Sequence, residues 1–232
     1  HANIHKALKY AVKLDLISSN PADKIERPKK ERFMANFYDA DEVNRLFEIS
    51  KGTKLEIPIL FGAFYGMRRS ETLGLKWDAI DFERDTITIR HTLTTVALDG
   101  KRITVAEDRT KNKSSMRTLP LVPFVKERLL ELKAEQEENR RLCGRSYVKD
   151  YTGYVCINEI GDIIKPNYVS CGFPKLLEEH GLRRVRYHDL RHSCASLLLA
   201  NGVPMKQIQE WLGHSDFSTT ANIYAHLDYS SK

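Results

Sequence analysis

Two histidines four residues apart, His188 and His192, lie in the stretch VRYHDLRHSCASLLLANG at residues 185–202. Because Asp189 directly follows the first, the stretch imitates the H-E-x-x-H motif of zinc hydrolases, in which both histidines bind the metal. Arg191 lies between the histidines, however, and its guanidinium repels a divalent cation in the same helical turn. Asp189 is also one carbon shorter than the glutamate base of that motif. A zinc hydrolase is therefore disfavoured.

An anion suits these residues better than a metal ion does. Arginine offers a planar fork of donors that matches phosphate oxygens, and a neighbouring histidine moves protons near neutral pH. A purely structural role, in which the histidines cap or pack a helix, stays open until other residues join them. Further residues of suitable chemistry occur at turns and expected helix starts: Arg68, Lys111, His214 and Tyr224.

Basic residues gather in three places along the chain. The 37 Lys and Arg residues outnumber the 31 acidic ones, which gives a net charge of +6. The clusters occupy residues 24–32, 109–117 and 183–191. Each alone is consistent with a solvated loop, but three clusters beside turns or helix starts favour a groove lined with phosphate-binding groups.

The composition is that of a globular protein, with 41% hydrophobic and 29% charged residues in a chain of 232. Its four cysteines fall in no zinc-binding spacing, which indicates thiols in a reducing compartment. The sequence contains no signal peptide and no apolar run of membrane-spanning length. We therefore expect a cytoplasmic, nucleoid-associated protein with no membrane partner.

Hydrophobic periodicity predicts a mostly α fold with a small antiparallel β-sheet, an α+β class. β-branched residues that alternate with others predict strands at 85–97 and 103–108, and a second hairpin at 110–121 that turns at 112–115. Residues 143–165 give no clear pattern. Helices are expected at 3–17, 39–50, 55–67, 68–80, 122–141, 165–181, 187–202, 204–215 and 217–227.

The first helix has no apolar partner near it in the sequence. We therefore interpret residues 1–20 as the last helix of a mostly missing domain. Residues 21–34 contain prolines and several basic residues, which indicates an extended basic linker. Residues 35–232 then form a second, larger domain, which would be the catalytic one if the motifs described next carry chemistry.

Four short signatures in a fixed order make the chain resemble the tyrosine recombinase (phage integrase) family. They are G-x-R-x-S-E-x-L-x-L-x-W at Gly66–Trp77, T-K-x-K-S at Thr110–Ser114, H-D-L-R-H at His188–His192, and L-G-H-S followed by Y at Leu212–Tyr224. The resemblance covers the chain from about residue 35 to its end, and it is most similar to integrases of conjugative transposons and phages. It implies a catalytic domain of the tyrosine-recombinase type, preceded by the closing helix of a core-binding domain.

The resemblance also implies what each signature does. Tyr224 would attack a scissile phosphodiester, form a 3′-phosphotyrosyl link and release a 5′-hydroxyl. Arg68 and Arg191 would clamp the non-bridging oxygens, and Lys111 would protonate the leaving oxygen. The remaining matched residues have supporting parts: His188 would accept or share the tyrosine proton, His214 would hydrogen-bond the phosphate, and Glu71 and His192 would give structural support.

This chemistry agrees with the residue types. Tyrosine has a pKa near 10, so it needs a base or a strong positive field to act as a nucleophile. Phosphoryl transfer depends mainly on positioning and charge neutralisation, which two arginines and a lysine supply. We therefore expect no cofactor, no metal and no ATP, because the phosphotyrosine conserves the bond energy for rejoining.

The resemblance implies that the partner is double-stranded DNA that carries recombination sites. It also implies that the protein forms a homo-oligomer, a tetramer, on this DNA, and that accessory DNA-bending proteins take part. The expected activity is integration and excision of a mobile element. Two alternatives stay open: a nicking-closing enzyme like the type IB topoisomerases, and a non-catalytic DNA-binding protein on the same scaffold. Candidate DNA contacts are Arg69, Lys113, Arg117, Arg183 and Arg186.

Overall fold

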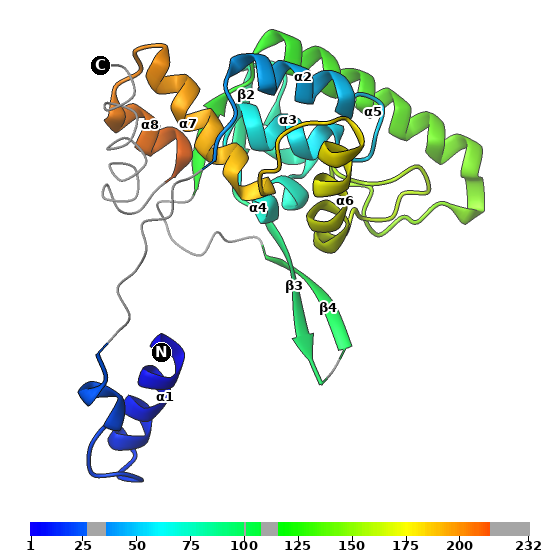
Figure 1. The fold of residues 1–232 in the computed structure, drawn as a ribbon. Helices are drawn as coiled ribbons and strands as arrows, with labels where there is room; N and C mark the ends of the chain where they lie inside the picture. Colours follow the sequence, from blue (N-terminus) through cyan, green and yellow to red (C-terminus); the bar gives the residue numbers. More distant parts are fainter. Residues whose placement is uncertain (27–35, 100, 108–115, 214–232) are drawn as a thin grey trace. The chain divides into compact units, whose positions relative to one another are not determined.

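The computed structural model describes residues 1–26, 36–99, 101–107 and 116–213. The chain divides into two compact units, His1–Met34 and Ala35–Lys232, which are taken in turn. Figure 1 gives the labels of the helices and strands. Within the described ranges, no helix combines the length and the apolar character needed to cross a membrane.

The first unit consists of helix α1 (Ala2–Lys13) and a 3₁₀ turn at Pro21–Lys24. The helix ends four residues earlier than expected, and Asp15 takes a left-handed φ of 54° just after it. An imidazole–carboxylate contact of 2.6 Å between His5 and Asp23 ties the turn to the helix. No residue of α1 is fully buried, and its apolar residues Ile4 and Tyr10 are more than half exposed.

In the described part of the second unit, seven α-helices pack around a largely apolar core. Helix α3 (Glu56–Phe64) is buried over seven of its residues, because it carries apolar side chains on all sides. Helix α2 (Ala40–Ser50) begins after Asp39, which is its N-cap and forms a capping box with Glu42. The remaining five are α4 (Arg69–Gly74), α5 (Pro123–Cys143), α6 (Pro166–Glu179), α7 (Leu190–Ala200) and α8 (Met205–Leu212).

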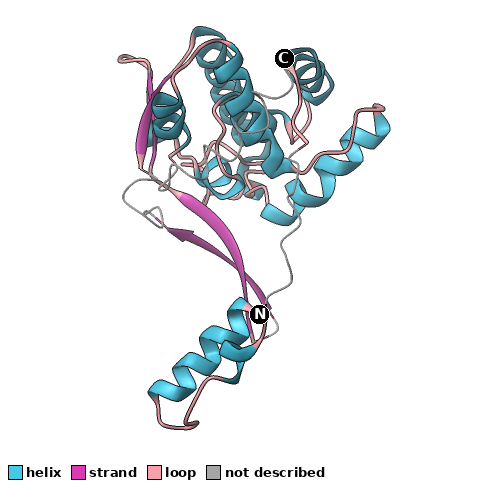
Figure 2. Ribbon diagram, turned by 60° about the vertical axis from the view of Figure 1, so that its left-hand side comes forward, coloured by secondary structure: helices cyan, strands magenta, loops and turns pink. Residues whose placement is uncertain are grey.

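Among the residues that the structure describes, two small antiparallel sheets interrupt the helices. The first has the order β1-β2-β5, with β1 at Ile80–Asp81, β2 at Thr86–Ile89 and β5 at Arg117–Pro120. The second pairs β3 (Thr92–Leu98) with β4 (Lys101–Glu107). Figure 2 shows β3 and β4 as a twisted ribbon that extends away from the helices.

The α+β class is confirmed, and three expected elements are divided. The helix expected at 68–80 stops at Gly74, because Leu75 is extended and its carbonyl accepts a hydrogen bond from Val155. The strand expected at 85–97 breaks between β2 and β3. The helix expected at 187–202 starts as a 3₁₀ turn, Tyr187–Asp189, before α7. Strand β5 pairs with β2, and the turn expected at 112–115 lies outside the described residues.

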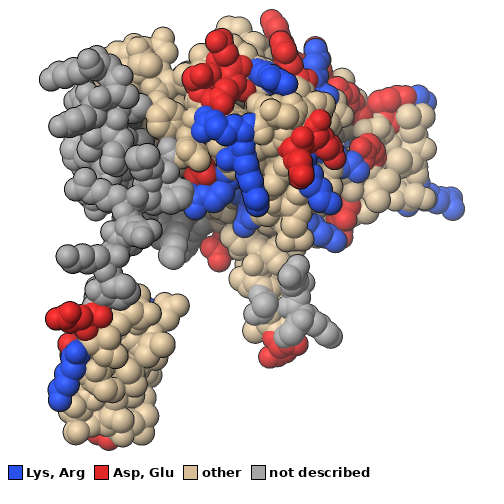
Figure 3. All heavy atoms as spheres, viewed as in Figure 1, with Lys and Arg blue, Asp and Glu red and all other residues tan. Residues whose placement is uncertain are grey.

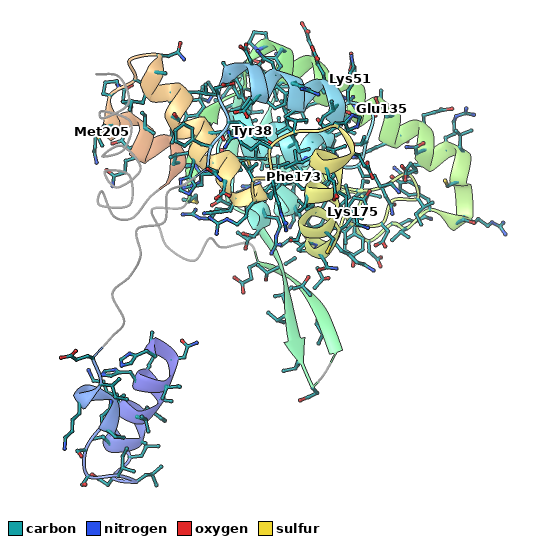
Figure 4. The ribbon with its side chains drawn as sticks, in the orientation of Figure 1. Tyr38, Lys51, Glu135, Phe173, Lys175 and Met205 are labelled. Carbon is teal, nitrogen blue, oxygen red and sulfur yellow. The ribbon has the colours of Figure 1, made fainter. Side chains whose placement is uncertain are left out.

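Two fully buried aromatic residues connect the core to the segment that precedes α7. Tyr38 and Phe173 both lie near the middle of the unit (Figure 4). The backbone N–H of Tyr38 donates to Ser193 Oγ at 2.9 Å. Phe173 packs edge-on against Tyr187, with 5.7 Å between the ring centroids. Ser193 lies in α7 and Tyr187 in the turn before it, so both contacts attach the start of α7 to the core.

Candidate active site

Arg191 is a buried arginine in the first turn of α7, with 2% of the residue exposed. Its Nη1 donates to the carbonyl oxygen of Gly66 at 2.6 Å, and its Nη2 donates to that of Leu212. Burial lowers the pKa of Arg191 to about 9, and the charge of Arg68 acts in the same direction. The guanidinium is still charged at neutral pH, so a full positive charge lies beneath the surface here.

Gly66 provides one of these carbonyls from the turn between α3 and α4. Its φ of +62° lies in the left-handed region, where a residue without Cβ is not strained. A Cβ at this position would lie 2.4 Å from Leu212 Cδ2. Glycine therefore lets the turn approach α8 closely, as the G-x-R signature requires.

Arg68 is the N-cap residue of α4 and is only partly buried, with 34% of its side chain exposed. Its Nη1 donates to Glu71 Oε1 at 2.6 Å, and its backbone N–H donates to Glu71 Oε2 at 3.0 Å. Its Nη2 also reaches the carbonyl oxygen of Gly213, at 3.3 Å. Arg68 thus has a solvent-accessible edge that Arg191 lacks.

Glu71 is buried, with 2% exposed, and holds two arginines at once. In addition to Arg68, Arg117 Nη2 donates to Glu71 Oε2 at 3.0 Å. Burial alone would raise the pKa of this carboxyl, but the charges and hydrogen bonds of Arg117 and Arg68 outweigh it and hold the pKa below its usual range. Glu71 is therefore a buried carboxylate that binds Arg68 and Arg117 together.

The three arginines converge on the C-terminal end of α8. Arg117 Nε donates to the carbonyl oxygen of Trp211 at 2.6 Å. With the bonds from Arg191 and Arg68, three consecutive carbonyls, at residues 211–213, each receive a guanidinium donor. Carbonyls at a helix C-terminus have no partner within the helix and carry partial negative charge. This end of α8 is therefore an electrostatic match for the arginines.

His188 and His192 lie one turn apart, with their rings edge-on and 5.8 Å between centroids. Partial desolvation lowers the pKa of His188 below 6.5, and the charges of Arg191 and His192 act in the same direction, whereas Asp189 opposes them. Residue 188 remains exposed to solvent. Neutral imidazole is therefore the main form of His188 at neutral pH, and its ring is accessible to a ligand.

Nδ1 of His192 is a buried polar atom for which the described residues supply no hydrogen-bond partner. Desolvation lowers the pKa of His192 as well, against the charge of Asp189. The same carboxylate is held by Arg186, whose Nη2 donates to Asp189 Oδ1 at 2.8 Å. His192 is thus in edge-on contact with His188, and its supporting role stays a prediction.

The expected DNA contacts fall into two groups. Arg69, Arg183 and Arg186 are exposed, although Arg183 already binds Glu42 with Nη2–Oε2 at 2.8 Å. Arg117 has only 6% of its side chain exposed, which argues against a direct DNA contact. On the face shown in Figure 3, a group of Lys and Arg atoms lies near the middle of the unit with acidic atoms directly above it.

Four of the predicted residues, Lys111, Lys113, His214 and Tyr224, lie outside the described residues. Gly213, the last residue before that segment, ends α8 in the left-handed conformation. The predictions for these four residues therefore stay predictions, and the observed geometry concerns Arg68, Glu71, His188, Arg191 and His192.

The sequence interpretation missed the place of Arg117 in this network. In β5, Arg117 and Leu119 are buried whereas Thr118 and Pro120 are exposed. An arginine on the same strand face as a buried leucine was the available signal, because a buried arginine is almost always paired.

The fold is that of the catalytic domains of tyrosine recombinases. The Tn1549 transposon integrase in complex with transposon right end DNA superposes with a TM-score of 0.73, at 20% identity, over 98% of this chain and 74% of that one. The XerH site-specific recombinase bound to a palindromic difH substrate gives a TM-score of 0.58 at 25% identity, over 86% of this chain and 52% of that one.

The chain belongs to the phage integrase family, whose model matches residues 36–231. A tyrosine recombinase XerC-like protein of Caldanaerobacter subterraneus subsp. tengcongensis is 33% identical over 217 residues, which are 91% of this chain and 54% of that protein. The tyrosine recombinase XerC of Pediococcus pentosaceus is 30% identical, over 94% of this chain and 67% of that protein. The chain thus spans about half to two thirds of these relatives.

Proposed function

We propose that the chain is the catalytic part of a site-specific DNA recombinase, an integrase that cleaves and rejoins strands through a 3′-phosphotyrosine intermediate. The observation that carries the proposal is the convergence of Arg68 and Arg191 on adjacent carbonyls, those of Gly213 and Leu212. Two guanidiniums from distant parts of the chain thus meet directly before His214 in the sequence. Membership of the phage integrase family and the recombinase relatives support the same activity.

In the proposed reaction the Tyr224 oxygen attacks the scissile phosphorus, and its proton passes to His188. The phosphorus–tyrosine bond forms as the bond to the 5′ oxygen breaks, and Lys111 supplies the proton that leaves with the 5′-hydroxyl. Arg68 and Arg191 neutralise the charge that grows on the non-bridging oxygens, and His214 hydrogen-bonds the same phosphate. The reverse steps, with a different 5′-hydroxyl, rejoin the strands without ATP.

His188 suits the part of proton acceptor because its pKa is lowered. A histidine that is mostly neutral at pH 7 has a free nitrogen lone pair for the tyrosine proton. The positive charge of Arg191, which helps to lower this pKa, belongs to the same phosphate clamp. The clamp and the base are therefore coupled through charge.

We also propose the organisation around this catalytic part. Residues 1–20 close a core-binding domain, which accounts for the exposed apolar residues of α1, and residues 21–34 are the linker. The protein acts on double-stranded DNA in the bacterial cytoplasm as a tetramer, with accessory DNA-bending proteins, to integrate and excise a mobile element. The exposed arginines 69, 183 and 186, together with Lys113, contact the DNA backbone.

The test uses nicked suicide duplexes with randomised sequence around the nick, incubated with the protein in EDTA. Wild-type protein should form a covalent adduct that denaturing electrophoresis separates, and Tyr224→Phe should form none. DNA binding without any adduct would contradict the proposal in favour of a non-catalytic protein. Selected duplexes are then offered in pairs, and a supercoiled plasmid that carries the selected sequence is offered separately. Strand exchange between duplexes supports a recombinase, whereas relaxation of the plasmid without exchange indicates a topoisomerase-like enzyme.

A further inference from the structure

Arg117 connects α4 to the end of α8 from a third element, β5, whereas Arg68, which also reaches both, belongs to α4 itself. Its Nη2 binds Glu71 Oε2 at 3.0 Å, and its Nε binds the carbonyl oxygen of Trp211 at 2.6 Å. Glu71 is on α4, Trp211 is in the last turn of α8, and Arg117 itself is the first residue of β5. The planar guanidinium fixes the directions of both bonds, so it sets the position of α8 relative to α4.

All the carbonyls at the end of α8 have hydrogen-bond donors. Those of Gln209 and Glu210 accept from the backbone N–H of Gly213, at 2.9 and 3.1 Å. The carbonyls of residues 211, 212 and 213 accept from Arg117, Arg191 and Arg68, respectively. Arg117 therefore holds the turn of the helix that lies just before the carbonyls contacted by the two phosphate-clamp arginines.

Charge sharing at Glu71 gives Arg117 a second effect. Arg68 uses Nη1 for Glu71 Oε1 and leaves Oε2 to Arg117 and to a backbone N–H. Without Arg117, the buried carboxylate of Glu71 would lose one of its two cationic partners. Arg68 is the neighbouring group whose two Nη atoms could both turn toward that carboxylate. A fully engaged Arg68 would then be drawn away from the phosphate.

We propose that Arg117 is a positioning residue of the recombination reaction: by binding Glu71 and the end of α8 together, it holds Arg68 and Arg191 in their phosphate-binding geometry. The inference rests on the proposed function. Arg117 is not assigned a contact with the phosphate, because only 6% of its side chain is exposed and its guanidinium is bound to the buried Glu71.

The experiment compares the rate of adduct formation with the affinity for DNA. Arg117→Gln should slow adduct formation on a selected suicide duplex by roughly tenfold to a hundredfold, below the loss for a direct donor. Its DNA affinity and the salt dependence of that affinity should stay at wild-type values, since each lost phosphate contact would lower the salt slope by about one. Arg141→Gln, which removes an exposed arginine paired with Glu138 on α5, is the matched control and should leave the rate unchanged.

Several outcomes decide the matter. A wild-type rate for folded Arg117→Gln overturns the inference, and so does a weaker affinity with a lower salt slope, which would make Arg117 a phosphate contact. If Arg117→Gln does not fold, Arg117→Lys carries the test: it keeps the charge without the planar fork, so a reduced rate supports the inference and a wild-type rate overturns it.

A readout independent of activity separates this inference from the proposed function. The ¹⁵N–¹H signals of the Nε–H groups of Arg68 and Arg191 should shift in the Arg117 variant and stay in place in Arg141→Gln. Unshifted signals would overturn the positioning role even if the wild-type protein formed no adduct. A wild-type protein without adduct, but with shifted signals in the variant, would contradict only the proposed function.

Discussion

The buried guanidinium of Arg191 donates a hydrogen bond to the carbonyl oxygen of Leu212, which ties the start of α7 to the end of α8. The carbonyl belongs to the L-G-H-S signature, and the arginine belongs to H-D-L-R-H. Two signatures that are separate in the sequence therefore form one structural contact. The segment after α8, which carries His214 and Tyr224, begins at this contact.

Substitution of either clamp arginine should abolish most of the cleavage. Arg191→Gln and Arg68→Gln should each slow adduct formation by about a hundredfold or more, the loss expected for one preorganised transition-state donor. Arg191→Gln should also lower the melting temperature more, because Arg191 is buried and donates to two backbone carbonyls. Adduct kinetics and thermal unfolding of both variants check this prediction, and equal melting temperatures would contradict it.

Glu71→Gln should destabilise the protein by about 3–5 kcal/mol at neutral pH, since it leaves the buried Arg117 without its carboxylate partner. Because the pKa of Glu71 is lower in the folded state than its unfolded value near 4.5, its ionisation stabilises the folded state at pH values above 4.5. This stabilisation is lost as the pH falls from 4.5 through the lowered pKa of the folded state. The free energy of unfolding should therefore decline less steeply below pH 4.5 in the variant than in the wild type. Denaturant titrations between pH 3 and 7 measure this, and parallel curves would count against the arrangement.

The lowered pKa of His188 predicts the pH dependence of cleavage. As the pH is lowered, the cleavage rate should begin to fall only below pH 6.5, the ordinary pKa of histidine, because the imidazole of His188 stays neutral to lower pH. Single-turnover adduct formation from pH 5 to 8 gives the profile. His188→Gln should be slower and should lack this acid limb, whereas an unchanged limb in the variant would assign it to another group.

Gly74 packs against the backbone of β3, so its replacement should loosen the ribbon. A Cβ there would lie 2.6 Å from Thr92 Cα and 2.8 Å from Leu93 N, and backbone atoms yield less readily than the end of a side chain. Gly74→Ala should cost about 1–3 kcal/mol of stability. Gly153→Ala is the control, because a Cβ at Gly153 meets nothing within 4 Å; an equal loss in both variants would contradict this packing.

The sequence predicted well those features that depend on local pattern. The helix expected at 39–50 is one, since α2 occupies Ala40–Ser50. The signature residues Arg68 and Arg191 were also found from type and spacing, and the structure brings both to the end of α8.

Features that depend on contacts between distant segments were not predicted. The helix expected at 68–80 is cut at Leu75, because its carbonyl bonds to Val155 eighty residues later in the chain. Arg117 was expected to contact DNA, whereas the pairing of β5 with β2 and the packing of α8 bury it beside Glu71. Local periodicity contains no information on such partners.

The most direct test of the account is to locate the covalent bond. The adduct formed on a suicide duplex is digested with protease and nuclease, and the modified peptide is sequenced by mass spectrometry. The account predicts a nucleotide joined through a 3′-phosphate to Tyr224. A phosphotyrosine at Tyr229 or at any other residue, formed at the wild-type rate in Tyr224→Phe, would contradict it.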